Sequence, residues 1–441
     1  MRLRSTLLLL ATLAAVFAIA MGRFACETPT EAQAEHIAVH NSTAYTLPPA
    51  ELQKAVALNR TGRTLAVAGA VWMPLQLLLI LVFGLAAWMH GVAVNLSKNR
   101  WAQGFSFIFL LLLIAHLFDL PLGIYAHRVA LSYGLSVQGW GSWLADKAKM
   151  FALEWLFGGL LTMLIFLVIR RSPTRWWFWF WIPAVLCLIA GVFVTPYIID
   201  PMFNKYEPLA KSNPALTQRL QQVVARGGVS IPPERMFLMR ASAKSTEINA
   251  YVTGFGASKR VVVWDTTIAK STPDEISFIF AHEMGHYALG HVAAGVALNC
   301  LALLPLLLLG FHGVRFLLAR YGAAWRIPSQ QDWGALVVLL LVLCVLSTLS
   351  DPFANAFSRA IEHNADVYGQ EAIHGIVANP QQVGRQAFQT LGELSLDDPT
   401  PHPLYELWFD THPPVYYRAA FAEAYDPWAA GEQPKYFAAG R

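Results

Sequence analysis

The sequence predicts a mainly α-helical protein that crosses a membrane several times and carries one water-soluble domain with a small β-sheet. Of its 441 residues, 56% are hydrophobic and 14% are charged, and the mean hydropathy is +0.43. Soluble globular proteins carry about a quarter charged residues. About seven apolar runs lie along the chain, each a candidate membrane span. Together these features predict a polytopic helix bundle and exclude an ordinary soluble enzyme.

The N-terminal segment, residues 1–64, begins with a signal-like apolar run from Leu7 to Met21 that two arginines precede. The run is shorter than the about 20 residues that span a bilayer. Ala18-Ile19-Ala20 is a weak cleavage pattern, so a signal peptide and a first span both fit. The rest of the segment is polar and amphipathic. A helix that opens at Leu47-Pro48-Pro49 is expected to lie along the membrane or on the soluble domain.

Six further runs are long enough to span a membrane, at residues 65–89, 105–125, 151–169, 176–199, 292–311 and 333–349. The first four predict a transmembrane bundle over residues 65–200, and the last two predict two membrane helices over residues 292–350. Tryptophans near the ends of the runs suit the membrane–water interface. His116, Asp119 and Glu154 lie inside the runs, so each should face either a wet cavity or a polar partner on another helix.

The two remaining parts, residues 201–291 and 351–441, predict the halves of one soluble domain. Pro208 to Arg226 is an amphipathic helix that ends at Gly227. Residues 236–239 and 260–264 are short β-rich runs, and Tyr251 begins a third. A small sheet is therefore expected in the first half of the domain.

One motif at the end of that first half has the pattern of a metal site: His282-Glu283-Met284-Gly285-His286. On a helix both histidines project from one face and can bind one zinc ion. Glu283 is turned by about 100° from His282 and lies beside the metal, where a general base would take a proton from the attacking water. Thr272 as N-cap and Pro273 in the first turn support a helix here.

A catalytic zinc usually has three protein ligands and one position for water. A third histidine ten residues after the first is absent, because that position is Val292, and the motif precedes an apolar run instead of lying within one. After Glu283 the next glutamate is Glu362, and Asp366 lies one turn further on the same helix face. Glu362 is therefore predicted as the third ligand, Asp366 as the acceptor for a ligand histidine, and Arg359 as a residue that steadies the Glu362 carboxylate.

These motifs resemble those of the Ste24-type CAAX prenyl proteases, membrane zinc endopeptidases of family M48, which also includes HtpX-like proteases. Besides the zinc motif, the matching segments are Asp200–Lys205, Asn249–Tyr251, Lys259–Arg260, Asp265–Thr266, Asn355–Asp366 and Thr411–Pro414 with Arg418. The resemblance covers most of the chain, and the combination is more specific than the zinc motif alone.

The resemblance implies a bundle of about seven spans that encloses a chamber, and a gluzincin-like zinc peptidase domain with one Zn²⁺ per chain. It also favours an uncleaved first span. It assigns the substrate-binding strand edge to Asn249, Ala250 and Tyr251, where a peptide would add as an extra strand. It assigns stabilisation of the oxyanion to His412, with Arg418 nearby to bind a substrate carboxylate.

The sequence leaves the role of His402 undecided and gives His291 no part in the metal site. Spacing alone does not separate His402 from His412, and it leaves a capping role open. His291, five residues after His286, does not share the ligand face of a continuous helix and is interpreted as structural.

The expected function is hydrolysis of peptide bonds by an integral-membrane zinc endopeptidase. Its expected partners are membrane lipids and peptide or protein substrates, including lipidated or membrane-embedded ones. Three alternatives stay open. They are a quality-control protease of HtpX type, an intramembrane protease with His282 at bilayer depth, and a non-catalytic membrane protein with a structural zinc. An intact Glu283 argues against the last. The net charge of +4, spread over loops, gives no reason to expect nucleic acid.

The protein is expected in the cell (inner) membrane, with the side of the zinc domain left open. Basic residues gather in alternate loops, at Lys98, Arg100, Arg170, Arg171, Arg175, Arg315, Arg320 and Arg326. The positive-inside rule places such loops in the cytoplasm and the zinc domain outside it. Lys147 and Lys149 oppose this bias, and the eukaryotic members of the resembling family have the domain in the cytosol.

Overall fold

The computed structural model describes residues 44–254 and 259–437. The predicted first span at residues 7–21 lies outside these ranges. Within them, six helices are long and apolar enough to cross a membrane, and they correspond one by one to the six further runs. They are α3 (Pro49–Val82), α5 (Arg100–Ser132), α6 (Trp140–Arg171), the run Trp176–Phe203, α13 (His291–Trp325) and α14 (Ala335–Ile373). The mainly α-helical, polytopic fold is therefore confirmed.

The run Trp176–Phe203 consists of three helical pieces. They are α7 (Trp176–Val194), the π-helical turn η1 (Thr195–Ile199) and α8 (Asp200–Phe203). The short apolar helix α4 (Leu85–Leu96) lies between α3 and α5 and begins after Gly84, which has a φ of 71°. A left-handed residue of this kind ends one helix and redirects the chain into the next.

The membrane helices contain 28 to 39 residues, more than the about 20 that cross a bilayer, so they extend into the soluble part. The helix predicted to open at Leu47-Pro48-Pro49 is present as the start of α3 and contacts the soluble domain, where Arg63 Nη2 lies 3.0 Å from Asp398 Oδ2. It does not end before residue 64, because α3 runs unbroken from Pro49 into the membrane segment. α14 likewise continues through Pro352 without a break. Membrane helices tolerate an internal proline when neighbouring groups satisfy the freed carbonyl. The predicted boundaries at residues 64 and 350 thus fall inside continuous helices.

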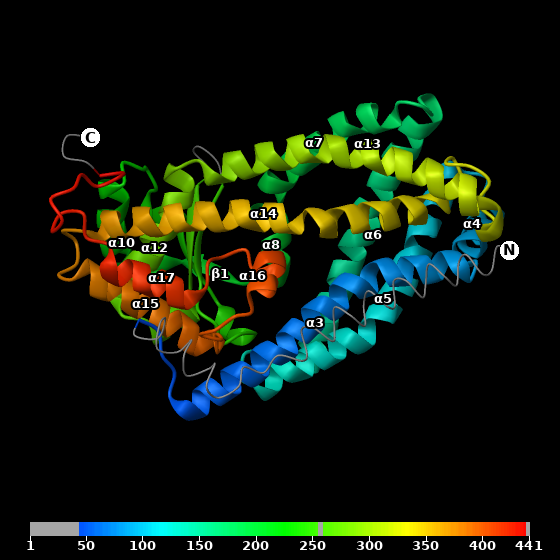
Figure 1. The fold of residues 1–441 in the computed structure, drawn as a ribbon. Helices are drawn as coiled ribbons and strands as arrows, with labels where there is room; N and C mark the ends of the chain where they lie inside the picture. Colours follow the sequence, from blue (N-terminus) through cyan, green and yellow to red (C-terminus); the bar gives the residue numbers. More distant parts are fainter. Residues whose placement is uncertain (1–43, 255–258, 438–441) are drawn as a thin grey trace.

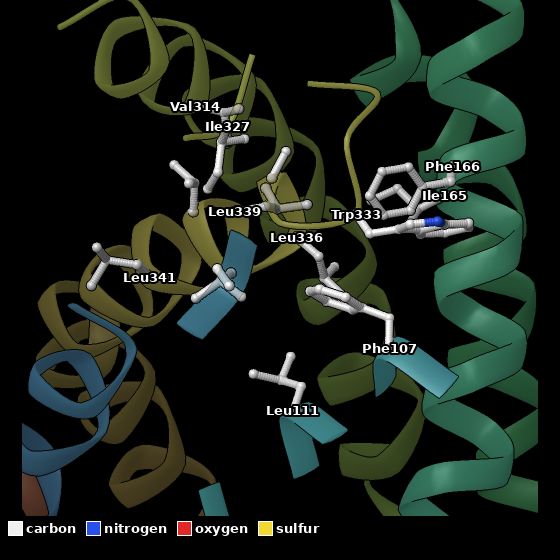
Figure 2. Close-up of a cluster of buried hydrophobic side chains, with 14 of the residues drawn as sticks. Phe107, Leu111, Ile165, Phe166, Val314, Ile327, Trp333, Leu336, Leu339 and Leu341 are labelled. Carbon is white, nitrogen blue, oxygen red and sulfur yellow. The ribbon is translucent and has the colours of Figure 1, made fainter. Parts of the chain in front are cut away.

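The membrane helices pack around a hydrophobic cluster. Figure 2 shows Phe107 of α5, Phe166 of α6 and Trp333 converging, and the rings of Phe166 and Trp333 have centroids 4.6 Å apart. The indole Nε1 of Trp333 donates to Gln103 Oε1 at 3.2 Å, so the polar atom of this buried ring has a partner. The connection between α13 and α14 is thereby fixed to α5 and α6.

The polar groups predicted inside the spans contact each other. His116 Nε2 of α5 lies 3.3 Å from Glu154 Oε2 of α6, and Gln76 Nε2 of α3 donates to Asp119 Oδ1 at 3.3 Å. Each pair joins two different helices. The structure supplies the polar partner on a neighbouring helix, while the side chains of His116 and Glu154 are 33% and 39% exposed, so the expected wet cavity stays a prediction.

The soluble domain contains a four-stranded sheet in the order β1-β2-β4-β3. Its strands are β1 (Tyr206–Pro208), β2 (Met236–Met239), β3 (Ala250–Thr253) and β4 (Arg260–Trp264). β2 and β4 are parallel, and the other two pairs are antiparallel. The three predicted strands are present. The edge strand β1 was missed, because it has only three residues and ends in a proline.

Helices from both halves of the domain cover this sheet and its neighbour α12 (Pro273–Ala288). They are α9 (Leu209–Ser212), α10 (Pro214–Arg226), α11 (Asp265–Lys270), α15 (Pro380–Ser395) and α17 (Val415–Ala424), with short 3₁₀ turns at Pro233–Arg235 and Ala241–Ala243. A further helix, α16 (Pro403–Phe409), packs against α14, where Asn355 Nδ2 donates to Trp408 O at 2.7 Å. Gly369 of α14 lies directly against α12: a Cβ there would be 3.2 Å from the backbone nitrogen of His282. This close approach fixes α14 beside α12.

The connections alternate between two ends of the bundle (Figure 1). We call the end formed by residues 83–99, 172–175 and 326–334 the distal end. Its segments contact each other: Gln330 Nε2 donates to Pro173 O at 2.8 Å, and His90 Nδ1 lies 3.1 Å from Asp332 Oδ1. The soluble domain lies at the opposite end of the bundle, and the loop after α5 reaches it through an isolated bridge between Ser136 and Ser245.

Candidate metal centre

The start of α12 is fixed by a complete capping box. The Glu275 backbone N–H donates to Thr272 Oγ1 at 3.3 Å, and the Thr272 N–H donates to Glu275 Oε2 at 2.6 Å. Two otherwise unpaired donors of the first turn are thus satisfied. Pro273 follows at the first helical position, where its missing N–H has no effect. The motif His282-Glu283-Met284-Gly285-His286 lies in the last two turns of this helix.

Three side chains converge at one point between α12 and α14. His282 Nε2 lies 3.2 Å from His286 Nε2 and 3.3 Å from Glu362 Oε2, while Glu362 Oε1 lies 3.4 Å from His286 Nε2. Tetrahedral zinc with bonds of about 2.0–2.1 Å would separate its ligand atoms by about 3.3 Å. The predicted ligands therefore have the spacing of a metal site.

The hydrogen bonding of Glu362 also fits a cation. Its Oε2 atom is buried and accepts no hydrogen bond from any described residue. A buried carboxylate oxygen without a donor is costly unless a cation binds it. Two imidazole nitrogens and one carboxylate form the three-ligand set of many catalytic zinc sites, so these residues fit a single metal ion.

His282 is held from behind by Asp366 and Arg418. Its Nδ1 lies 2.8 Å from Asp366 Oδ1, and Arg418 donates to both oxygens of Asp366 at 2.7 and 2.9 Å. Burial lowers the pKa of His282, but the hydrogen bond with Asp366 and the nearby Glu362 outweigh it and raise the pKa to about 9. Carboxylates that favour a proton on this ring also favour a metal cation at its Nε2. Asp366 lies where it was predicted.

His286 is held by a residue that was interpreted as structural. Its Nδ1 lies 3.1 Å from Nδ1 of His291, the first residue of α13. The separation of five residues suggested different faces, but α12 ends at Ala288 and Gly290 turns the chain with a φ of 70°. The glycine four residues after the motif is the signal in the sequence that a continuous helix was the wrong assumption.

Glu283 lies beside the ligands and opens onto a cavity. Its Oε1 is 4.0 Å from His282 Nε2, and burial raises the pKa of its carboxyl group above the ordinary value. The cavity has a volume of about 480 Å³ and is also lined by Asn249, Phe388 and Asp397. A cavity of this size has room for a peptide segment, and the Glu283 carboxylate lies in its wall next to the three predicted ligands.

His412 lies on the other side of Glu362. Its Nε2 is 3.4 Å from Glu362 Oε2, its Nδ1 is 3.0 Å from Thr411 Oγ1, and its ring lines the cavity with 57% of the side chain exposed. His402 has a different place: its Nδ1 accepts from the Leu404 N–H at 3.2 Å, and it is the N-cap of α16. The structure thus separates the two histidines that spacing could not.

Two arginines differ from their predicted contacts. Arg359 does not reach Glu362; its Nη1 donates to the backbone carbonyls of Glu406 and Asp410 at 2.8 and 2.7 Å. The Arg359 side chain points away from α14 towards α16, and not along α14 towards Glu362. Arg418 is buried and donates to both oxygens of Asp366, a contact that was not predicted. It also lines the cavity, so its binding of a substrate carboxylate stays a prediction. Both arginines support the site from behind.

The predicted substrate edge is an edge strand. β3 pairs with β4 alone in the sheet, and Asn249, just before it, lines the cavity with Glu283. Ala250 is buried, and the Tyr251 hydroxyl lies 3.1 Å from that of Tyr206 on β1. Of the three residues, Asn249 is the one that lines the cavity.

Two protein families match the chain, one over its first part and one over its second part, which includes α13 and α14. Residues 210–426 match peptidase family M48, and residues 32–205 match the family described as CAAX prenyl protease N-terminal, five membrane helices. The first match contains all three residues of the metal cluster. The second ends just before β1, near the predicted boundary at residue 200.

Individual relatives agree with these matches. The chain is 34% identical over 328 residues to the uncharacterized metalloprotease YhfN of Bacillus subtilis, covering 74% of each protein. It is 31% identical over 193 residues to CAAX prenyl protease 1 of Saccharomyces cerevisiae, covering 43% of this chain and 42% of that one. The crystal structure of S. mikatae Ste24p has a TM-score of 0.75 at 22% identity, over 94% of this chain and 96% of that one, and so shares the fold.

Proposed function

Because the chain belongs to peptidase family M48 and is a multi-pass membrane metalloprotease, we propose that it hydrolyses peptide bonds with one Zn²⁺ held by His282, His286 and Glu362. The observation that carries this proposal is the convergence of three possible ligand groups whose atoms lie 3.2 to 3.4 Å apart. Glu283 lies beside them and is not one of the three. A purely structural metal site needs no such base.

The mechanism divides its tasks among residues around the cavity. A zinc ion bound there would polarise the peptide carbonyl and lower the pKa of water. Glu283 takes the proton from the attacking water and delivers it to the leaving amine. His412 donates from Nε2 to the oxyanion that develops on the carbonyl, in the orientation that Thr411 supports. The edge of β3 beginning at Asn249 aligns the peptide as an added strand.

The test is cleavage of a fluorogenic peptide by the detergent-purified protein and by its Glu283→Gln variant, each with its zinc content measured. Glutamine keeps the shape of the side chain but is not a base. We expect kcat to fall by about 10²–10⁴-fold while one zinc per chain is retained. If both proteins hold zinc and neither cleaves a broad peptide set, the site is structural. If the parent holds no zinc, the metal assignment itself is wrong.

We further propose that the substrates include prenylated peptides, because a relative 31% identical over 193 residues is named a CAAX prenyl protease. Two peptides that differ only in a farnesyl group on one cysteine test this. A higher kcat/KM for the farnesylated peptide supports the proposal. Equal cleavage of both peptides contradicts it and favours a quality-control protease of HtpX type.

We also propose that the metal domain lies outside the cytoplasm. Eight basic residues lie in or near the distal end: Lys98, Arg100, Arg170, Arg171, Arg175, Arg315, Arg320 and Arg326. Its acidic residue Asp332 is paired with His90. At the opposite end, Lys149 is paired with Asp146 at 3.3 Å. Cytoplasmic loops carry the excess of lysine and arginine, so the distal end is the better candidate for the cytoplasmic side.

Reporter fusions test this orientation. Alkaline phosphatase folds only outside the cytoplasm, so a fusion after residue 441 should be active and a fusion in the turn at residues 172–175 should be inactive. The reverse pattern would place the metal domain in the cytosol. A cytoplasmic fluorescent reporter at the same two positions gives the complementary signal.

A further inference from the structure

We propose that His291 orients the metal ligand His286 by accepting its hydrogen bond, and that it thereby couples membrane helix α13 to the metal centre. This rests on the proposed function in one respect, because it takes His286 as a ligand. In this role His291 is a positioning residue, since it touches the ligand and not the reacting atoms.

The rings of His286 and His291 face each other through their Nδ1 atoms. His286 Nδ1 lies 3.1 Å from His291 Nδ1, and the ring planes are inclined by 71°. The opposite nitrogen of His286, Nε2, faces His282 and Glu362. His291 is buried, with 9% of its surface exposed, so water does not readily replace it as the partner of His286.

The role of His286 fixes the direction of this hydrogen bond. A neutral imidazole has one N–H, and a ring nitrogen that binds a metal carries no proton. If Nε2 of His286 is a ligand, its proton lies on Nδ1 and is donated to His291 Nδ1. His291 must then be neutral at Nδ1 and carry its own proton on Nε2. The pair is thus a donor and an acceptor in one defined order.

The chain reaches this arrangement through a break between two helices. On a continuous helix, a residue five positions beyond His286 would be rotated by about 140° and face away from it. α12 ends at Ala288 with Leu289 as its C-cap, Gly290 adopts the left-handed conformation, and His291 begins α13. The turn brings the first side chain of the membrane helix back onto the last turn of the metal-binding helix.

The partner of His286 differs in charge from the partner of His282. Asp366 is an anion, although Arg418 balances its charge, whereas His291 is a neutral acceptor. A neutral partner donates less charge through the ring than a carboxylate does. It therefore orients the ligand without reducing the positive charge that a bound metal needs to polarise a carbonyl.

Three substitutions of His291 separate the acceptor role from simple packing. Asparagine has an oxygen at the same number of bonds from Cα as Nδ1 and can accept the hydrogen bond there. Glutamine carries its oxygen one bond further, and leucine has no acceptor. The readouts are the rate of zinc loss to a chromogenic chelator, the visible spectrum of the Co²⁺-substituted protein, and the melting temperature of the metal-free protein in detergent.

We expect His291→Leu to lose zinc about 10–100-fold faster than the parent and to shift the cobalt spectrum. His291→Asn should stay near the parent in both, and His291→Gln should resemble the leucine variant. The proposal is overturned if the leucine variant keeps the parent's rate and spectrum. It is also overturned if all three variants lose zinc equally and melt equally early without metal, because His291 then only packs the corner. A parent without zinc would instead contradict the proposed function.

Discussion

His282 and His286, the two histidines proposed as metal ligands, lie one turn apart on the same helix but are supported in different ways. Asp366 and Arg418, both from the last 91 residues, hold His282 in a fully buried ion pair. A single histidine at the start of a membrane helix, His291, contacts His286, whose side chain is 19% exposed. One ligand is fixed by charge within the soluble domain, and the other by the connection to the membrane.

This difference predicts which property, folding or metal binding, a substitution near each histidine will change. The Asp366 carboxylate and Arg418 are shielded from water, so each depends on the other to offset the cost of its burial. The contact of His286 is neutral and depends on the position of a turn instead. We therefore expect changes on the His282 side to affect both folding and metal binding, and changes on the His286 side to affect metal binding with little effect on folding.

The largest effect is expected for Asp366→Asn. It removes the anion between His282 and Arg418 and leaves the buried guanidinium with only the more distant Glu362 carboxylate, 3.9 Å away, as a countercharge. Breaking a buried ion pair in this way costs about 3–5 kcal/mol. We expect a marked fall in the melting temperature of the metal-free protein, together with about 10–100-fold weaker zinc binding. Both are measured in the same detergent.

The matched control is the double variant Asp366→Asn with Arg418→Met. Removing the orphaned cation should restore much of the stability but not the zinc affinity, because the acceptor for His282 is still missing. If the single variant melts like the parent and binds zinc as tightly, the charged support of His282 has no energetic role, and the contrast between the two ligands fails.

A smaller effect is expected for Arg359→Met, which tests a third support that belongs to neither ligand. Arg359 donates to the carbonyls of Glu406 and Asp410, and this segment leads directly to His412. Without it, we expect kcat to fall by about 10-fold, while zinc content and the cobalt spectrum stay unchanged, because His412 is less well positioned for the oxyanion.

The contrary result would assign Arg359 to the metal. If the methionine variant loses zinc faster than the parent, Arg359 acts on Glu362 as the sequence predicted. Arg359→Lys is the companion variant. Lysine keeps the charge but lacks the planar donors that reach two carbonyls, so a drop in kcat similar to that of methionine is expected.

The sequence could predict those features that depend on the regular spacing of residues within a single helix. His282, Glu283 and His286 are set by spacing within one helix, and Glu362 with Asp366 by spacing within another, so all five were found from the sequence. Membrane helices were recognisable because an apolar run of about 20 residues with few charges is typical of a membrane span. Their lengths were not, since α3 and α14 continue as helices beyond the apolar runs.

The supports of the site could not be derived in this way. Whether Arg359 turns towards Glu362 or towards α16, and whether Arg418 meets Asp366 or a substrate, depends on how α14, α16 and α17 pack. His291 was missed for a local reason: one left-handed residue, Gly290, cancels the helical periodicity that the assignment assumed. The ligands follow from periodicity, whereas their partners follow from breaks in it and from tertiary packing.

The smallest effect is expected for Gly290→Ala, which tests the turn without touching either histidine. A Cβ at Gly290 has open space, so only its φ of 70° opposes the substitution. The left-handed conformation costs an alanine about 1–2 kcal/mol. We expect part of this strain to be relieved by a shift of His291 away from His286, and zinc to be lost several-fold faster.

Gly431→Ala is the matched control, because that residue has a φ of 69° and equally open surroundings but lies away from the turn. It should lower stability by a similar amount and leave the zinc rate unchanged. If the two variants lose zinc at the same rate, the turn only joins two helices, and the membrane connection of His286 has no part in holding the metal.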